Sequence, residues 1–165
     1  KSDCRQHKAK TLGMINQTHL LEKSLTVEIN NSYRDCIWSI KTNSLYIKIK
    51  STKTYASVLW IYGNFLHNEK DIVEDPLTVI RYLEESINCF DGLEIHDKEY
   101  YQCLTLLGNS YLSYYKTTKN LSYFLKSKSI GKILYQERYS YFNEPQIKLF
   151  ATNLNNEIRQ IETSI

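Results

Sequence analysis

The chain has 165 residues, a formal net charge of +3, five glycines and two prolines. This length suits one ordinary domain with a real core, and so little glycine and proline excludes a turn-rich all-β fold. No apolar run approaches the roughly 18 residues that a membrane-spanning helix needs, and no secretory leader is visible. The chain begins with Lys1 and not with methionine, so we expect it to be a piece of a longer protein.

Charged residues are spread unevenly along the chain. Residues 1–56 carry ten basic and four acidic side chains, residues 57–99 carry three and ten, and residues 100–165 carry eight and four. A nucleic-acid-binding protein more often shows one strongly basic stripe.

The cysteines occur singly, at positions 4, 36, 89 and 103, which is typical of buried reduced thiols. We therefore expect an intracellular protein, cytoplasmic or nuclear.

Residues 3–50 predict flanking helices. Apolar residues between Cys4 and Leu21 have the spacing of an amphipathic helix over about residues 3–25. The polar residues 30–32 predict a turn, and a second helix should run from Ser32 into the forties. Residues 44–50 are ambiguous, because Leu45, Ile47 and Ile49 alternate with polar residues as in a strand. We favour helix there, since an isolated strand leaves its backbone groups unpaired.

The next stretch predicts a helical hairpin over residues 55–91. Apolar residues from Tyr55 to Leu66 recur three and four apart, with Gly63 among them. Asp75 and Pro76 then predict a helix start, because aspartate caps free N–H groups and proline tolerates the first helical position. This second helix should end at Asp91–Gly92.

A second hairpin is predicted over residues 98–134. Asp97 begins a helix that carries Gly108 in the middle of its apolar face and ends near Lys116. Glycine inside a helix costs about 1 kcal/mol relative to alanine, so we expect a second helix to approach closely there. That partner should run from Leu121 to about Leu134. Pro145 then predicts a final amphipathic helix over residues 144–163.

The two hairpins share a sequence pattern. The first reads Leu59-x2-Tyr62-Gly63-x2-Leu66, followed by Val79-x3-Leu83-x2-Ser86. The second reads Leu104-x2-Leu107-Gly108-x2-Tyr111, followed by Asn120-x3-Phe124-x2-Ser127. This pattern resembles the tetratricopeptide (TPR) repeat, although Leu59 and Leu104 stand where that family has tryptophan.

The resemblance implies an all-α fold of antiparallel hairpins stacked as a TPR-like array, in a single domain of residues 1–165. Gly63 and Gly108 should each face the second helix of their own hairpin. A non-repeating helical bundle is the alternative.

No pattern of catalytic or metal-binding residues stands out. The sequence has no glycine-rich phosphate loop, no Gly-x-Ser-x-Gly and no His-Glu-x-x-His. Cys4-x2-His7 is half of a zinc site without a second half. Glu84 and Glu85 are adjacent on a helix, so their side chains diverge by about 100°. We expect no enzyme, no metal and no cofactor.

The surplus of tyrosine and lysine on the second hairpin predicts a partner-binding surface. Its residues are Tyr101, Asn109, Tyr115, Lys116 and Lys119. Tyrosine is enriched at interfaces, and the lysines would pair with an acidic segment. The resemblance implies a peptide or helix bound on the side of the first helices. The expected function is a non-catalytic scaffold or adaptor in a larger complex.

Two other functions stay open. One is a nucleic-acid-associated domain, resembling the TPR-containing telomerase and RNA-decay factors. It would use a set of basic residues in the N-terminal part: Lys8, Lys10, Lys48, Lys50 and Lys53. The other is a piece of a very large cell-division or assembly protein, which packs mainly against its own chain.

Overall fold

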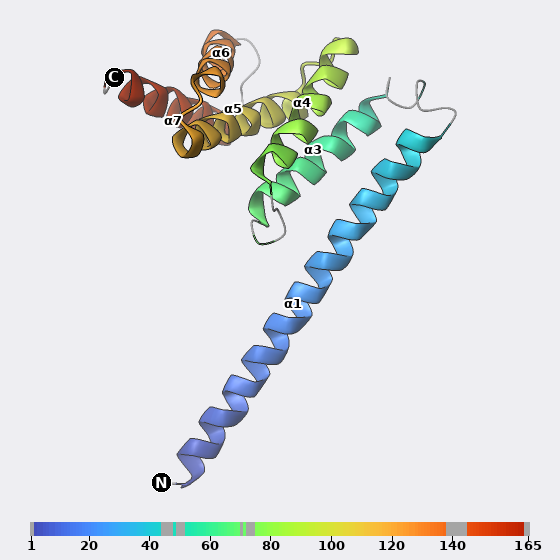
Figure 1. The fold of residues 1–165 in the computed structure, drawn as a ribbon, viewed down its shortest axis with the longest axis vertical. Helices are drawn as coiled ribbons and strands as arrows, with labels where there is room; N and C mark the ends of the chain where they lie inside the picture. The colour runs from blue at the N-terminus through green and yellow to red at the C-terminus, as the bar shows by residue number, and fades with distance from the viewer. Residues whose placement is uncertain are drawn as a thin grey trace. The chain divides into compact units, whose positions relative to one another are not determined.

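The computed structural model describes residues 2–43, 48, 52–69, 71, 75–137 and 145–163. Over these residues the fold is all-α, with six helices and no strand. The helices are α1 (Ser2–Thr42), α3 (Lys53–Asn68), α4 (Pro76–Gly92), α5 (Lys98–Thr118), α6 (Leu121–Glu137) and α7 (Pro145–Glu162), labelled as in Figure 1. The predicted all-α class is therefore confirmed.

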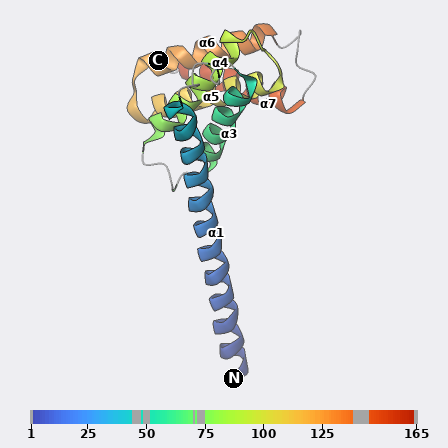
Figure 2. The same ribbon diagram turned by 90° about the vertical axis from the view of Figure 1, so that its right-hand side faces the viewer.

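The chain divides into two compact units, Lys1–Asn43 and Ser44–Ile165. The first holds α1 and the second holds α3 to α7, which Figure 2 shows gathered together. That residues 1–165 form one domain stays a prediction. The ambiguous residues 44–50 lie outside the described part except for Lys48, which is helical.

The predicted turn at residues 30–32 is wrong, because α1 runs unbroken through it (Figure 1). Ser32 donates its hydroxyl hydrogen to the Glu28 carbonyl oxygen at 2.9 Å, and Thr26 does the same to Glu22 at 2.9 Å. A serine or threonine hydroxyl that donates to a carbonyl oxygen of the preceding helical turn is satisfied within the helix, so it does not favour a turn in its place. No glycine or proline stands between residues 14 and 62 to end the helix.

The predicted helix starts in the second unit are confirmed by their caps. Asp75 Oδ1 accepts a hydrogen bond from the Leu77 N–H at 2.9 Å, with Pro76 at the first helical position. Asp97 Oδ1 accepts from the N–H groups of Glu99 at 3.0 Å and Tyr100 at 3.3 Å. Thr52 caps α3 by accepting from the Tyr55 N–H at 3.3 Å.

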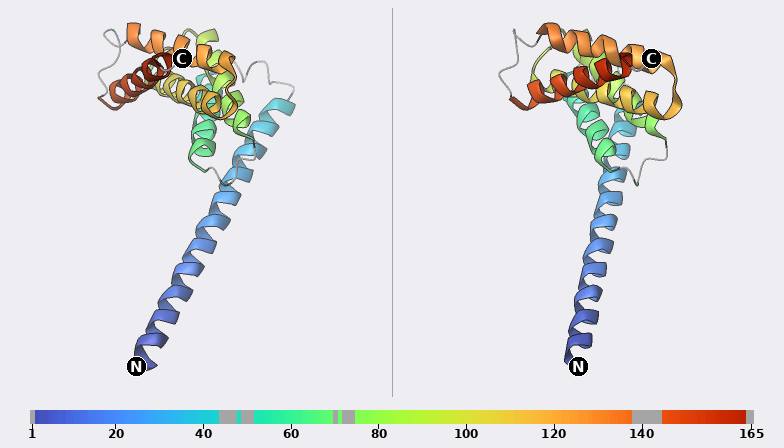
Figure 3. Two further views of the ribbon diagram at one scale, coloured as in Figure 1. Left: turned by 60° about the vertical axis from the view of Figure 1, so that its left-hand side comes forward. Right: turned by 90° about the vertical axis from the view of Figure 1, so that its left-hand side faces the viewer.

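Pairwise packing joins the five helices of the second unit. Helix α3 packs against α4 and α5, α4 against α5, α5 against α6 and α7, and α6 against α7. Figure 3 shows α6 and α7 side by side. The core between them is made of leucine, isoleucine, tyrosine and phenylalanine, among which Leu59, Leu83, Phe90 and Leu134 are fully buried.

Glycines set the closest approaches between these helices. A Cβ added to Gly63 would lie 2.8 Å from Leu83 Cδ2 on α4. One added to Gly108 would lie 3.0 Å from Ile130 Cγ2 on α6 and 2.7 Å from Leu154 Cδ2 on α7. The prediction that both glycines face the second helix of their own hairpin is confirmed, and Gly108 faces a third helix as well.

At three small residues, a side chain of one helix also donates a hydrogen bond to the backbone of the neighbouring helix. Ser86 on α4 donates to the Ala56 carbonyl oxygen at 2.8 Å, and Ser127 on α6 donates to that of Gly108 at 2.9 Å. Asn155 on α7 donates to the Gly131 carbonyl oxygen at 3.1 Å. These donors reach a partner carbonyl because the residue there is small, so the polar groups are satisfied inside a close-packed interface.

The two hairpins are antiparallel but differ in register. Gly63 meets Leu83, whereas Gly108 meets Ile130, which lies six residues beyond Phe124, the residue that the sequence pattern aligns with Leu83. Helix α5 has 21 residues and reaches α6 through residues 119–120. Helix α3 has 16 residues and reaches α4 through residues 69–75. In the second hairpin, the extra residues of α5 take the place of part of the connecting segment. The contacts of Gly108 are therefore shifted along α6.

Replacing Gly108 with alanine should destabilise the protein by about 1–3 kcal/mol, because the added methyl group meets buried side chains of two helices and overpacks the core. The matched control is Gly92→Ala, where the added Cβ has no neighbour within 4 Å. That change should be neutral or stabilising. Urea denaturation measures both, and a Gly108→Ala protein as stable as Gly92→Ala would contradict the packing.

The Asp97 cap should give a pH-dependent stability. Burial alone would raise the pKa of Asp97, but the hydrogen bond and charge of Lys53, with Nζ 2.6 Å from Oδ2, and the backbone N–H groups lower it below its ordinary value. The carboxylate therefore stabilises the folded state above pH 3.8, the ordinary value, and this contribution is lost as pH falls through the lowered pKa.

Two variants of Asp97 separate the stability that comes from capping the helix from the stability that comes from the carboxylate charge. Asp97→Asn keeps a cap and should lose less stability at pH 7 than Asp97→Ala, which should lose about 1 kcal/mol or more. The gap between wild type and Asp97→Asn should shrink as the pH is lowered to 3. Denaturant melts at both pH values test this, and a gap that stays constant or widens in acid would refute the ionic contribution.

Candidate functional site

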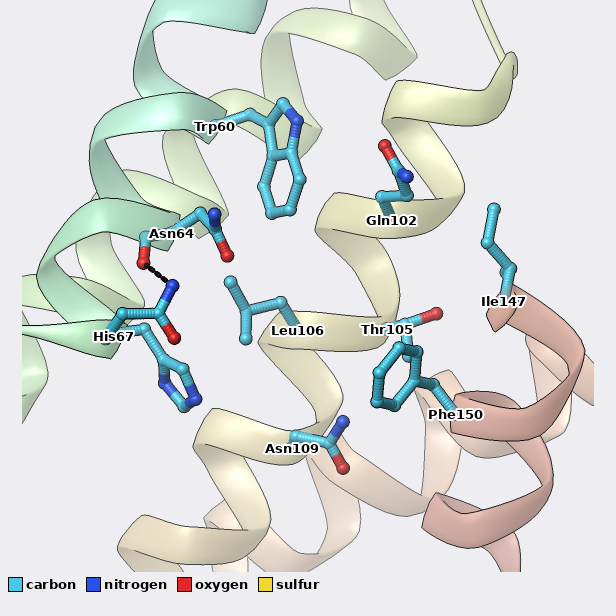
Figure 4. A pocket seen from close by; sticks show the side chains of 10 residues that line it. Trp60, Asn64, His67, Gln102, Thr105, Leu106, Asn109, Ile147 and Phe150 are labelled. Atoms are coloured by element: carbon cyan, nitrogen blue, oxygen red, sulfur yellow. Dashed lines mark hydrogen bonds between the residues drawn. The ribbon is translucent and has the colours of Figure 1, made fainter. Parts of the chain in front are cut away.

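A cavity of about 390 Å³ lies where α3, α5 and α7 face one another (Figure 4). Each helix contributes residues three, four or seven apart, which lie on one helix face. The lining residues are Trp60, Asn64, His67 and Asn68 from α3, Gln102, Thr105, Leu106 and Asn109 from α5, and Ile147 and Phe150 from α7. We call this surface the α3–α5–α7 groove.

The groove has an apolar floor with polar groups around it. Leu106 lies in the middle, between the α3 residues on one side and Phe150 of α7 on the other (Figure 4). The side chain of Phe150 is 54% exposed, although it is large and apolar. A concave apolar floor with a few polar groups around it is the usual lining of a ligand pocket.

The amide side chains of the groove are available for a ligand. Within the described residues, the side chains of Asn64, Gln102 and Asn109 make no hydrogen bond, and all three are half-buried. Asn68 instead donates to the Asn64 backbone carbonyl oxygen at 2.9 Å. A carboxamide has one acceptor and two donors, the same groups as a peptide unit. The groove therefore offers paired donors and acceptors without a formal charge from lysine, arginine, aspartate or glutamate.

The residues predicted as the binding surface do not all lie there. Asn109 lines the groove. Tyr101 is only 3% exposed and packs edge-on against Tyr100 at 5.1 Å, so it belongs to the core and has to be removed from the predicted surface. The reason is its place on α5, on the face that carries Leu104 and Gly108.

The other three predicted residues lie together at the C-terminal end of α5. Tyr115 packs against Phe124 of α6 at 5.1 Å, and Lys119 Nζ lies 5.9 Å from the centre of the Tyr115 ring. Lys116 Nζ lies 2.5 Å from Glu157 Oε2 on α7. Lys116 thus already has an acidic partner within the chain, which weakens the expectation of an acidic ligand.

Sequence reasoning missed most of the groove. Trp60, Asn64, Gln102 and Phe150 were not among the predicted residues. They lie beside the apolar stripes that define the core, where the sequence alone does not distinguish a groove from solvated surface. The available signal was the repetition of amides at helical spacing, with Asn64 and Asn68 on α3 and Gln102 and Asn109 on α5.

The acidic pair Glu84–Glu85 serves packing. Its two carboxylates diverge as predicted: Glu84 accepts from the Tyr111 hydroxyl and pairs with Lys126 at 3.0 Å, while Glu85 accepts from the Tyr55 hydroxyl at 2.6 Å. Burial, together with Glu84, raises the pKa of Tyr111, so its phenol stays protonated and donates. These bonds tie α4 to α5, α6 and α3.

Most of the residues named for a metal site or a nucleic-acid site lie outside the described side chains. Among the side chains that the structure describes, no three histidine, cysteine or acidic residues cluster to hold a metal ion, and those of Cys4 and His7 lie outside this set. Of the predicted basic residues, Lys53 pairs with Asp97 and Lys48 is exposed. The side chains of Lys8 and Lys10, and residue Lys50, lie outside the described part.

Comparison with known proteins yields no relative: no family model, no curated protein sequence and no solved structure matches this chain. None of the described helices is long and apolar enough to cross a membrane.

The cysteines should differ in reactivity according to burial. Burial raises the pKa of Cys103 to about 12, because its thiolate would lie away from water, although the Ser86 hydroxyl opposes this rise. Cys36 is exposed. Because only the thiolate is nucleophilic, iodoacetamide at pH 7.5 should alkylate Cys36 and leave Cys103 unmodified in the folded protein.

Peptide mapping by mass spectrometry, with urea-unfolded protein as the control, checks this. Rapid alkylation of Cys103 in the folded protein would contradict the burial of its thiol.

Proposed function

We propose that this chain is a non-catalytic protein-interaction module, a scaffold or adaptor built as a TPR-like array, and that it binds an extended peptide segment in the α3–α5–α7 groove. The observation that carries the proposal is the set of half-buried amides without partners, at Asn64, Gln102 and Asn109, around the apolar Leu106 and Phe150.

The array is supported by the order of helix contacts. The two helices of each hairpin pack against each other. In addition, α4 packs against α5, and α6 packs against α7. Helices α3, α5 and α7 thereby line up on one side, as the first helices of successive hairpins do in stacked repeats. The shift in register between the two hairpins means that the repeat is approximate at α4 and α6.

The chemistry of the groove favours a peptide backbone over an acidic or nucleic-acid ligand. Amides can donate to peptide carbonyl oxygens and accept from peptide N–H groups. The aromatic rings of Trp60 and Phe150 can cover apolar side chains of the ligand. Without lysine or arginine in its lining, the groove has no permanently charged cation to pair with phosphate or carboxylate.

A random-peptide phage library panned on the protein should yield peptides that bind in this groove. Binding of the enriched peptides, measured by fluorescence anisotropy, should weaken about thirtyfold in an Asn64→Ala/Asn109→Ala protein, since two hydrogen bonds of about 1 kcal/mol each are lost. Asn88→Ala, at an exposed amide on α4 outside the groove, is the matched control and should bind normally.

Salt provides a second criterion. Affinity for the enriched peptides should change little with added NaCl, because no lysine, arginine, aspartate or glutamate lines the groove. Peptides that ignore the double variant, or whose binding falls steeply with salt, would show that the partner surface lies elsewhere on the chain.

A further inference from the structure

The α3–α5–α7 groove contains more N–H donors than acceptor oxygens. The indole Nε1–H of Trp60 can only donate, and within the described residues it has no hydrogen-bond partner, although the side chain is half-buried. Each carboxamide of Asn64, Gln102 and Asn109 adds two donors but a single acceptor oxygen. A ligand that presents acceptors along its length therefore suits this lining better than one that also presents many donors.

Few other acceptors remain for the N–H groups of a bound peptide. Thr105 is buried, and its hydroxyl donates to the Tyr101 carbonyl oxygen at 2.8 Å. The Asn64 backbone carbonyl oxygen already accepts from the Asn68 amide at 2.9 Å. The described lining residues include no aspartate or glutamate, and the described helices offer no strand edge with which a peptide could pair as a β-strand. An ordinary peptide would thus bury N–H groups without acceptors, which weakens binding.

Proline is the residue that avoids this cost. It has no backbone N–H, whereas its carbonyl oxygen remains an acceptor. Consecutive prolines adopt the polyproline II helix, which makes no internal hydrogen bonds and leaves its carbonyl oxygens free to accept from donors in a groove. Such a segment is ordered before it binds, so it loses little conformational entropy on binding.

The aromatic side chains of the groove suit the flat rings of proline. Trp60 of α3 and Phe150 of α7 lie on opposite sides of Leu106, as Figure 4 shows. The Phe150 side chain is 54% exposed, so much of its apolar surface is open to a ligand. Proline-rich segments commonly dock in grooves lined by aromatic rings, where the preformed helix presents proline rings to them.

We propose that the peptide bound by the α3–α5–α7 groove is a proline-rich segment in the polyproline II conformation. Its proline rings pack against Trp60 and Phe150, and its carbonyl oxygens accept from the Trp60 indole and from the amides of the groove. This inference rests on the proposed function, because it names the class of peptide that the same groove binds.

Tryptophan fluorescence tests the proposal from inside the groove. The chain has two tryptophans, at positions 38 and 60, so a Trp38→Phe protein emits from Trp60 alone. The probe is acetylated L-oligoproline of about ten residues, which is roughly three turns of the polyproline II helix. Its titration should shift the Trp60 emission and saturate.

The matched control is the D-proline oligomer, which has the same composition and apolar area but the opposite helical hand. It should bind about tenfold more weakly than the L-oligomer or not at all. The absence of a saturable shift with L-oligoproline, or equal affinity for the two enantiomers, would overturn the proposal.

Point variants assign the contacts, with fluorescein-labelled L-oligoproline and fluorescence anisotropy as the readout. Trp60→Phe keeps an aromatic ring but removes the indole N–H, and should weaken binding about fivefold. Phe150→Ala removes the ring on the other side and should weaken binding about fivefold or more. Trp38→Phe, at the exposed tryptophan of α1, is the control and should bind normally. Unchanged binding in both Trp60→Phe and Phe150→Ala, with folding confirmed by circular dichroism, would refute the contacts.

The phage-selected peptides separate this inference from the proposed function. Proline-rich peptides that lose affinity for the Asn64→Ala/Asn109→Ala protein support both. Peptides that lose affinity for that protein but carry no excess of proline would keep the groove as a peptide site and reject the polyproline inference. Peptides that ignore the double variant would reject the groove, and this inference with it.

Discussion

The structure of the second unit depends on how closely α5 can approach its neighbours at Gly108. No side chain stands there, so Ile130 of α6 and Leu154 of α7 both reach the α5 backbone, and Ser127 donates to the Gly108 carbonyl oxygen. This one position fixes two interfaces. Gly63 does the same for α3 and α4 on a smaller scale, with Leu83 as its neighbour. Close contact at small residues therefore explains why glycine is kept inside helices, where it is otherwise unfavourable.

The α3–α5–α7 groove follows from this packing. Because α4 and α6 take the apolar faces of α3, α5 and α7, the remaining face of those three helices is left to form the groove around Leu106.

Much of the fold could be predicted because its signals are local. The caps at Asp75 and Asp97 and the role of Gly108 follow from residue chemistry alone. The turn at residues 30–32 could not be predicted correctly, because the same Asn and Ser residues that favour turns also fit a helix when Ser32 bonds Glu28. The binding groove was harder to predict from the sequence, since it depends on which faces of the helices meet in the folded chain. Tyr101 and Lys116 looked like surface ligand contacts, but the fold buries the first and pairs the second with Glu157.

The central claim is that Gly108 brings α6 and α7 against α5 at one point. Nuclear Overhauser effects between the Gly108 Hα protons and methyl groups test it most directly, in protein with labelled leucine and isoleucine methyls. The structure predicts strong effects to both Ile130 and Leu154, because each side chain lies in contact with the glycine. An effect to Ile130 alone would leave α6 against α5 but remove α7 from the contact at Gly108, and the absence of both would contradict the account.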